Sequence, residues 1–171
     1  RAGGRALDIA AGSGDLSIGL ARQVGETGDV LSTDINARML SRARDRILDA
    51  GYAATIRLAV ADAEQLPFRS RQFDCVTVGF GLRNVTDKAA ALASMYRVLR
   101  PGGRVLVLEF SKLVLESLEP LYDFYSFNVL PRLGEFVADD AASYRYLAES
   151  IRKHPDQRVL QALMEAQGFE R

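Results

Sequence analysis

Short apolar runs alternate with longer stretches of helical period along residues 6–110, and Gly, Pro and Asp residues separate them. This alternation is typical of βα units arranged around a parallel sheet. Because the runs are apolar at successive positions, we expect helices to cover both faces of that sheet. The predicted strands are 6–10, 30–33, 56–61, 73–80 and 105–110.

Apolar residues three or four positions apart predict one buried stripe on each of three intervening helices. The stripes are Leu16, Leu20 and Val24; Met39, Ala43 and Ile47; and Leu92, Tyr96 and Leu99. Asn36 and Thr86 are predicted as N-caps, and Gly51 and the segment 101–103 as the ends of the helices before them.

Residues 111–155 break the alternation and hold 7 of the chain's aromatic residues, which number 6 Tyr and 8 Phe. We therefore predict one domain over 1–171 with an aromatic-rich substrate or lid insertion at about 111–155. Leu118, Leu121, Tyr122 and Tyr125 have helical spacing, which is typical of an amphipathic lid and equally of a segment that completes the core. A last amphipathic helix is predicted from about 156 to 167.

The composition narrows the class of protein. The chain has 171 residues, of which 48% are apolar and 26% charged, with 22 basic and 22 acidic side chains. These values are typical of one soluble globular domain, and the charge balance argues against a nucleic-acid partner. Cys75 is the single cysteine, and no Cys/His cluster has the spacing of metal ligands, so no metal is expected. No apolar run approaches the roughly 18 residues of a membrane span.

A turn of small residues follows the first predicted strand and contains Gly12, Ser13 and Gly14. Such a turn lets a ligand approach the backbone closely. A dinucleotide fingerprint needs a third glycine where Ser17 stands. Asp8 and Asp15 flank the turn and would repel a pyrophosphate, whereas they would attract a sulfonium or an ammonium group. The sequence thus favours S-adenosylmethionine as the ligand.

Acidic residues also end the second and third predicted strands. Asp34 is placed to accept hydrogen bonds from both hydroxyls of a ribose, and Asp62 with Ala63 to read an adenine amino group. The alternative for each residue is that the carboxylate only caps the next helix. Acidic residues after successive strands, together with the glycine turn, point more strongly to a cofactor site than the turn alone.

Several segments carry a family resemblance. Residues 8–15, 62–68 and 101–103 resemble the class I S-adenosylmethionine-dependent methyltransferases, and 80–85, 95–99, 108–111 and 143–151 resemble the ubiquinone/menaquinone biosynthesis C-methyltransferases. The resemblance implies an α/β, Rossmann-like fold with a mostly parallel sheet and S-adenosyl-L-methionine as cofactor. Two departures are Ala10-Ala11 in the turn and a glycine at position 79. The predicted cofactor residues are Asp8, Gly12, Ser13, Gly14, Asp34, Asp62, Ala63 and Gly79.

The implied reaction is C-methylation of a polyprenylated quinol, either demethylmenaquinol to menaquinol or the methylation of 2-polyprenyl-6-methoxy-1,4-benzoquinol. A ring carbon beside a phenolate is the nucleophile, and forming that phenolate at neutral pH costs about 4 kcal/mol. We predict that Arg83 stabilises the phenolate and that Asn84 donates a hydrogen bond to the quinol. The alternative is that Arg83 pairs with an acidic neighbour such as Asp87 and caps the loop. Candidate substrate residues are Tyr122, Tyr125, Tyr144 and Tyr146, and the alternative for them is a packing role.

A prenylated substrate suggests where the protein works. We expect a cytoplasmic protein peripheral to the inner membrane, on the matrix side in mitochondria, in contact with the membrane or with a quinone-synthesis complex; a homodimer is also considered. Alternative functions are methylation of another small phenol or lipid, and a non-catalytic subunit of such a complex. Family members extend beyond both ends of this sequence, so we expect it to be truncated at both ends.

Overall fold

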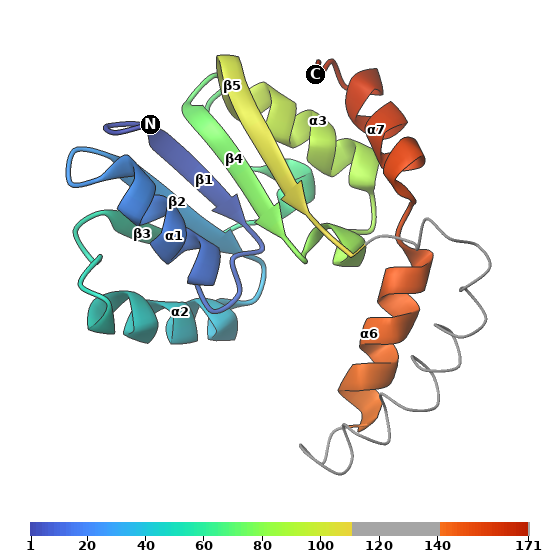
Figure 1. The fold of residues 1–171 in the computed structure, drawn as a ribbon, viewed down its shortest axis with the longest axis horizontal. Helices are drawn as coiled ribbons and strands as arrows, with labels where there is room; N and C mark the ends of the chain where they lie inside the picture. Colours follow the sequence, from blue (N-terminus) through green and yellow to red (C-terminus); the bar gives the residue numbers. More distant parts are fainter. Residues whose placement is uncertain (111–140, 171) are drawn as a thin grey trace. The chain divides into compact units, whose positions relative to one another are not determined.

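The computed structural model describes residues 1–110 and 141–170. It divides into two units, Arg1–Glu109 with Leu163–Arg171, and Phe110–Ala162. The first unit contains a sheet of 5 parallel strands in the order β3-β2-β1-β4-β5 (Figure 1). Its strands are β1 (Arg5–Ile9), β2 (Asp29–Asp34), β3 (Ile56–Val60), β4 (Phe73–Gly79) and β5 (Leu99–Leu108).

The predicted α/β fold is confirmed, with helices on both faces of the sheet. Helices α1 (Asp15–Val24) and α2 (Ala37–Asp49) share one apolar cluster with β1, β2 and β3. The chain moves from β1 through β2 to β3 toward one edge of the sheet, and from β4 to β5 toward the other edge. Because such crossovers are right-handed, helix α3 (Lys88–Val98), which connects β4 to β5, lies on the face opposite to α1 and α2 (Figure 1). The reversal of direction between β1 and β4 creates a switch point at the carboxyl ends of these strands.

The buried stripes differ in part from the predicted ones. On α1 the buried residues are Ser17, Ala21 and Val24, while Leu16 is 38% exposed. On α3 Leu92 is buried as predicted, but Tyr96 is 48% exposed and Leu99 already belongs to β5. Hydrophobic spacing therefore identified the helices but rotated two of the buried faces, because it takes no account of a polar residue such as Ser17 that finds partners in the core.

Local signals predicted two of the helix ends well. Asn36 caps α2 by accepting from the Arg38 N–H, and Gly51 follows the end of this helix with a φ of 78°. The cap of α3 is Asp87, which accepts from the Ala90 N–H, so the prediction of Thr86 was wrong by one residue. Helix α3 ends at Val98, and the segment 101–103 lies within β5, which starts at Leu99 rather than at Val105.

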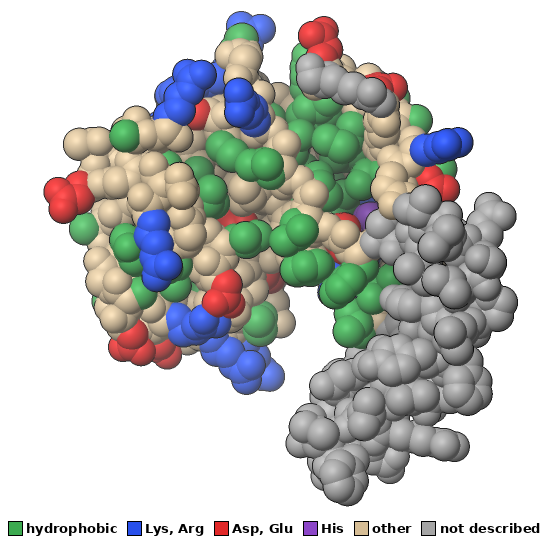
Figure 2. Space-filling model, in the orientation of Figure 1, with side chains coloured by type: hydrophobic (Ala, Val, Ile, Leu, Met, Phe, Trp, Pro, Cys, Tyr) green, Lys and Arg blue, Asp and Glu red, His purple; other side chains and the backbone are tan. Residues whose placement is uncertain are grey.

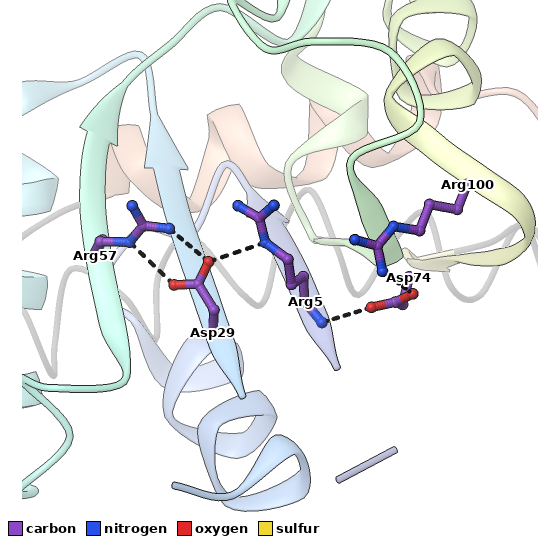
Figure 3. Close-up of polar contacts among 5 residues, drawn as sticks. All are labelled: Arg5, Asp29, Arg57, Asp74 and Arg100. Atoms are coloured by element: carbon purple, nitrogen blue, oxygen red, sulfur yellow. Dashed lines mark hydrogen bonds and ion pairs between the residues drawn. The ribbon is translucent and has the colours of Figure 1, made fainter. Parts of the chain in front are cut away.

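An alternating row of charges crosses the amino ends of all five strands (Figure 3). Asp29 lies between two arginines, at 2.5 Å from Arg57 and 3.3 Å from Arg5. Asp74 accepts from the Arg5 N–H at 2.7 Å and lies 2.8 Å from Arg100. Across β3, β2, β1, β4 and β5 the signs are therefore plus, minus, plus, minus, plus, which places opposite charges on every pair of neighbouring strands.

Strand β5 is the edge of the sheet in the described part of the first unit. Leu106 and Leu108 on one of its faces are 56% and 51% exposed. Figure 2 shows hydrophobic side chains gathered over this part of the sheet. Leu108 ends the strand beside the switch point, so this apolar face continues to the carboxyl edge.

The second unit contains helix α6 (Ala141–Lys153), and helix α7 (Gln157–Ala166) starts in it. Helix α7 confirms the predicted last helix. Asp156, just before its first turn, accepts a hydrogen bond from the Val159 N–H. His154, the single histidine of the chain, follows the end of α6 and is only 4% exposed. Within the described ranges, no helix has the length and apolar character to cross a membrane.

Candidate active site

A cavity of about 800 Å³ lies at the carboxyl ends of the strands, over the switch point between β1 and β4. The loops after β1, β2, β3 and β4 and the last residue of β5 form its wall. The lining residues discussed below are Ala10, Gly12, Ser13, Asp15, Leu16, Asp34, Asp62, Ala63, Glu64, Gly79, Phe80, Gly81, Asn84, Val85, Thr86 and Leu108.

The glycine turn forms the floor of this cavity. Gly12 lines it with a φ of 56°, and its N–H donates to Asp34 at 2.9 Å. Gly14 is also left-handed, with a φ of 85°, but it lies outside the lining set and packs against α2, where an added Cβ would stand 3.3 Å from the Ala43 Cβ. Gly12 therefore opens the backbone to a ligand, and Gly14 allows two helices to approach.

Asp34 joins the end of β2 to this turn. Its Oδ2 accepts from the Gly12 N–H, its Oδ1 accepts from the Asn36 N–H at 2.8 Å, and the residue is 9% exposed. A carboxylate offers about four acceptor positions, so each oxygen retains capacity for one more donor. The structure thus places Asp34 with two acceptors in the cavity wall, as the predicted contact to two ribose hydroxyls requires.

The predicted residues after β3 and β4 also lie in the wall. Asp62 and Ala63 begin the short helix η1 (Ala63–Gln65), where Asp62 accepts from the Glu64 N–H at 2.9 Å. Gly79 ends β4, and a Cβ there would stand 2.4 Å from the Leu16 Cδ1. A side chain at Gly79 would therefore displace the end of the Leu16 side chain.

Asp8 lies behind the glycine turn and not among the lining residues. It is fully buried and accepts from the hydroxyls of Ser17 at 2.6 Å and Thr77 at 2.7 Å. Burial raises the pKa of the Asp8 carboxyl, and these hydrogen bonds oppose that rise. The carboxylate ties β1 to α1 and β4, and this explains why Ser17 stands where a dinucleotide fingerprint has glycine. Asp8 and Gly14 thus support the cofactor residues from behind.

Asp15 has partners of its own at the cavity rim. Its carboxylate pairs with both terminal nitrogens of Arg46 and accepts from the Ser13 hydroxyl at 2.7 Å. The hydrogen bond from Arg46 is the main reason that the pKa of Asp15 is lowered. The sequence predicted that Asp8 and Asp15 attract a cationic ligand. In the structure the Asp8 carboxylate is buried behind the turn and the Asp15 carboxylate is paired with Arg46, so these two residues do not carry that argument.

The charge of the whole lining leads to the same ligand class. Among the described residues the lining includes the carboxylates of Asp15, Asp34, Asp62 and Glu64, and no Lys, Arg or His. Arg46 pairs with Asp15. A pyrophosphate would still meet the like charges of Asp34, Asp62 and Glu64 without a lining cation to offset them, whereas a sulfonium or ammonium group is attracted. The residues present thus fit a cationic adenosyl cofactor.

Asn84 lines the cavity, and Arg83 does not. Both belong to the short helix η2 (Leu82–Asn84) after β4. The Arg83 Nη1 lies 3.0 Å from the Glu109 Oε2, and the two side chains are 11% and 4% exposed. An acidic partner was one of the two predicted alternatives for Arg83, but the partner is Glu109 rather than Asp87. Stabilisation of a phenolate by Arg83 stays a prediction.

The four predicted substrate tyrosines lie outside the first unit. Tyr122 and Tyr125 fall outside the described residues, as do residues 111–140 of the insertion predicted at about 111–155. Tyr144 and Tyr146 belong to α6, and Tyr146 is 59% exposed. Their part in substrate binding stays a prediction.

Several residues in or next to the cavity were not predicted from the sequence, Glu109 and Phe80 among them. Glu109 directly follows β5, as Asp34 and Asp62 follow their own strands, and this position was the available signal. Phe80 follows β4 in a left-handed conformation, with a φ of 55°, and lines the cavity. Nothing in the sequence marks an aromatic residue for that conformation.

The strand order, the glycine turn and the acidic residues after β2 and β3 together define a class I S-adenosylmethionine-dependent methyltransferase. Solved structures have the same fold: YcgJ of Bacillus subtilis matches with a TM-score of 0.72 and 24% identity over 98% of this chain and 62% of its own. A SAM-dependent methyltransferase of Aquifex aeolicus matches with a TM-score of 0.62 and 20% identity over 83% and 73%. The chain belongs to the ubiE/COQ5 methyltransferase family, whose model matches residues 1–171.

Curated relatives are much closer in sequence than these structures. The ubiquinone/menaquinone biosynthesis C-methyltransferase UbiE of Legionella pneumophila (strain Lens) is 57% identical over 99% of this chain and 68% of its own length. That of Methylococcus capsulatus is 58% identical over 100% and 69%. The chain is therefore an S-adenosyl-L-methionine-dependent C-methyltransferase that spans about two thirds of the length of these relatives. No group of metal-ligating side chains occurs in the part of the chain that the structure describes.

Proposed function

We propose that the chain methylates a ring carbon of a polyprenylated quinol, demethylmenaquinol or 2-polyprenyl-6-methoxy-1,4-benzoquinol, in menaquinone or ubiquinone biosynthesis. The family match over the whole chain and the relatives named for this pathway support the proposal. The observation that carries the cofactor assignment is the cavity lined by four carboxylates and, among the described residues, by no basic side chain.

When bound, S-adenosyl-L-methionine supplies a methyl group on a positively charged sulfur. Asp34 would accept from the ribose hydroxyls, since each of its oxygens accepts one main-chain N–H and retains capacity for one more donor. Asp62 and Ala63 would hold the adenine, and Gly12 and Ser13 would face the amino-acid part with exposed backbone. These contacts orient the cofactor without a basic residue.

The acceptor would occupy the side of the cavity formed by the ends of β4 and β5. Leu16, Phe80, Val85 and Leu108 make this part apolar, and Asn84 supplies a polar side chain. An apolar wall suits an aromatic ring and excludes water, which strengthens every polar contact inside. A single amide in such a wall orients a hydroxyl of the ring.

The role of Asn84 is to donate a hydrogen bond to the quinol oxygen. A hydrogen bond to a charged oxygen is stronger than one to a neutral oxygen, so this contact favours the phenolate that makes the neighbouring carbon nucleophilic. Arg83 would add its positive charge from behind the wall. Glu109 reduces that charge, so Asn84 is the first residue to test.

The remaining proposals concern where the enzyme works. A polyprenyl tail partitions into the bilayer, so we propose a cytoplasmic enzyme that contacts the inner membrane, or a quinone-synthesis complex on it, from the matrix side in mitochondria. The tyrosines 122, 125, 144 and 146 and a lid within 111–155 would meet the tail. A homodimer is part of the same proposal.

Methyl transfer to defined acceptors tests the function. The purified protein with S-adenosyl-L-methionine is incubated with demethylmenaquinol, with the methoxy-benzoquinol and with a panel of simple phenols, and products are identified by mass spectrometry. We expect one added methyl group on a quinol ring. Methylation of the simple phenols alone would show that the substrate is a phenol other than the quinol. The absence of any methylated product in a single turnover would indicate a non-catalytic subunit.

A further inference from the structure

The loop 80–87 forms a large part of the cavity wall. Phe80, Gly81, Asn84, Val85 and Thr86 all line the cavity. The regular structure within this loop is limited to the short helix η2. Its position must therefore depend on contacts from other elements, which the described residues show at both ends of the loop.

Glu109 holds the first half of the loop from the end of β5. Its Oε1 accepts from the Arg83 N–H at 3.0 Å, and its Oε2 accepts from the Arg83 Nη1 at 3.0 Å. One buried carboxylate thus binds the main chain and the side chain of the same residue. A buried pair leaves an uncompensated charge when one partner is removed, so the ion pair resists displacement of the loop.

Glu64 holds the second half from the end of β3. Its Oε1 accepts from the N–H groups of Thr86 at 3.0 Å and Asp87 at 2.9 Å. Asp62 orients Glu64 by accepting from its N–H, and Asp87 then caps α3. Both contacts of Glu64 to the loop need an acceptor oxygen, and neither needs a negative charge.

Phe80 and Asn84 depend on these two anchors. Phe80 is 40% exposed, its N–H donates to the Leu108 carbonyl at 2.8 Å, and the Arg83 guanidinium lies 5.9 Å from the centre of its ring. The Asn84 N–H donates to the Gly81 carbonyl at 3.1 Å. A left-handed φ at an aromatic residue costs free energy and persists where surrounding contacts impose it.

We infer that Glu109 and Glu64 are positioning residues, which hold the loop 80–87 so that Phe80 and Asn84 form the acceptor wall of the cavity. The inference rests on the proposed function for the identity of the acceptor. The two carboxylates act differently: Glu109 acts as a charged partner of Arg83, and Glu64 acts as an acceptor for two main-chain donors.

Substitution of Glu109 tests its part of the inference. Glu109→Gln keeps the size of the side chain but leaves the guanidinium without its anion. We expect kcat/KM for the quinol to fall at least about tenfold, while the Kd for S-adenosyl-L-methionine changes less than about twofold. Asp74→Asn is the matched control, because it removes a carboxylate–arginine contact at the amino ends of the strands, far from the cavity. We expect it to leave both kcat/KM and the Kd unchanged. Equal losses in quinol turnover and cofactor affinity would overturn the inference.

A double-mutant cycle tests whether Glu109 acts through Arg83. Glu109→Gln introduced into Arg83→Met is expected to cause little further loss of kcat/KM, because the ion pair is already gone and glutamine keeps an oxygen for the main-chain N–H of residue 83. Additive losses would show that Glu109 acts on the reaction without Arg83 and would contradict its assignment.

Two substitutions of Glu64 test the acceptor role. Glu64→Gln keeps an oxygen that accepts from Thr86 and Asp87, so amide exchange at these two residues stays within about threefold of wild type, whereas Glu64→Ala speeds it at least about tenfold. Equal acceleration in both variants would show that the charge of Glu64 holds the loop, and would overturn this role.

Amide hydrogen exchange separates this inference from the proposed function. In Glu109→Ala, which removes the acceptor of the Arg83 N–H, that amide is expected to exchange at least about tenfold faster, and in Glu64→Ala the same holds for Thr86 and Asp87. Exchange reports on the loop whether or not a quinol is methylated, so a wild type without quinol activity would reject only the proposed function. Unchanged exchange in a folded variant would overturn the inference.

Discussion

Ala10 and Gly81 meet at the switch point, where a Cβ built on Gly81 would stand 2.4 Å from the Cβ of Ala10. Each residue lies just beyond a strand, Ala10 after β1 and Gly81 after β4, and both line the cavity. The glycine turn and the loop 80–87 are therefore in van der Waals contact. The absence of a side chain at Gly81 is what permits this contact.

Gly81→Ala should push these loops apart. Gly81 has a φ of −109°, which alanine adopts readily, so the effect comes from the contact with Ala10 and not from backbone strain. We expect methyl-transfer kcat/KM to fall at least about tenfold, the change that 1.4 kcal/mol gives. Gly19→Ala is the control, because an added Cβ there meets nothing within 4 Å, and alanine at this helical position stabilises α1 by about 0.5–1 kcal/mol. An unchanged kcat/KM in Gly81→Ala would contradict the steric account.

Asp34→Ala should weaken cofactor binding. The substitution removes two carboxylate oxygens from the cavity wall, one that accepts from the Gly12 N–H and one that accepts from the Asn36 N–H, so the Kd for S-adenosyl-L-methionine should rise by at least about tenfold. Isothermal titration calorimetry measures this change. Asp45→Ala, on the exposed side of α2, serves as the control and should bind like wild type. If Asp34→Ala also keeps the wild-type Kd, the ribose contact is wrong.

Asp8→Asn should lower stability by about 1–3 kcal/mol at neutral pH. One of the two hydroxyl donors, Ser17 or Thr77, would then face an amide N–H instead of a carboxylate oxygen. The measurement is urea unfolding of wild type and variant.

The difference in stability between wild type and Asp8→Asn should depend on pH, and the raised pKa of Asp8 fixes the direction of the change. The folded-state pKa of Asp8 is raised, so below that pKa the folded state binds a proton that the unfolded state has released. Wild type should therefore gain stability relative to Asp8→Asn as the pH falls from neutral through the raised pKa toward the unfolded value. A stability difference that is constant over this range would show that burial does not govern Asp8.

Asp74→Asn should show the opposite pH dependence. The pKa of Asp74 is lowered, first by the N–H of Arg5 and then by Arg100, so the carboxylate stabilises the fold above its unfolded pKa. The side chain is 43% exposed, which limits the destabilisation at neutral pH to about 1 kcal/mol. The difference from wild type should vanish as the pH falls through the lowered pKa, and it should shrink in high salt. Thermal unfolding measures both effects, and a difference that persists at low pH would contradict this role.

Features that depend on residues adjacent in the sequence could be predicted from the sequence. The five apolar runs correspond to the five strands, and Asn36 and Gly51 mark the two ends of helix α2. The glycine turn, Asp34 and Asp62 lie at the same edge of the sheet. In a parallel sheet all carboxyl ends lie at one edge, so residues that follow strands gather there whatever the strand order. This geometry explains why most predicted cofactor residues line one cavity.

The tertiary structure decided which residues face that cavity and which lie behind it. Asp8 is buried because β1 lies beside β4 and brings Thr77 to it from a distant part of the chain, and Glu109 reaches Arg83 because β5 lies beside β4. Periodicity and spacing describe one element at a time and contain no information about these neighbours. The sequence by itself therefore determined the elements, the edge and the cofactor class, and strand pairing alone determined the partners of Asp8 and Arg83.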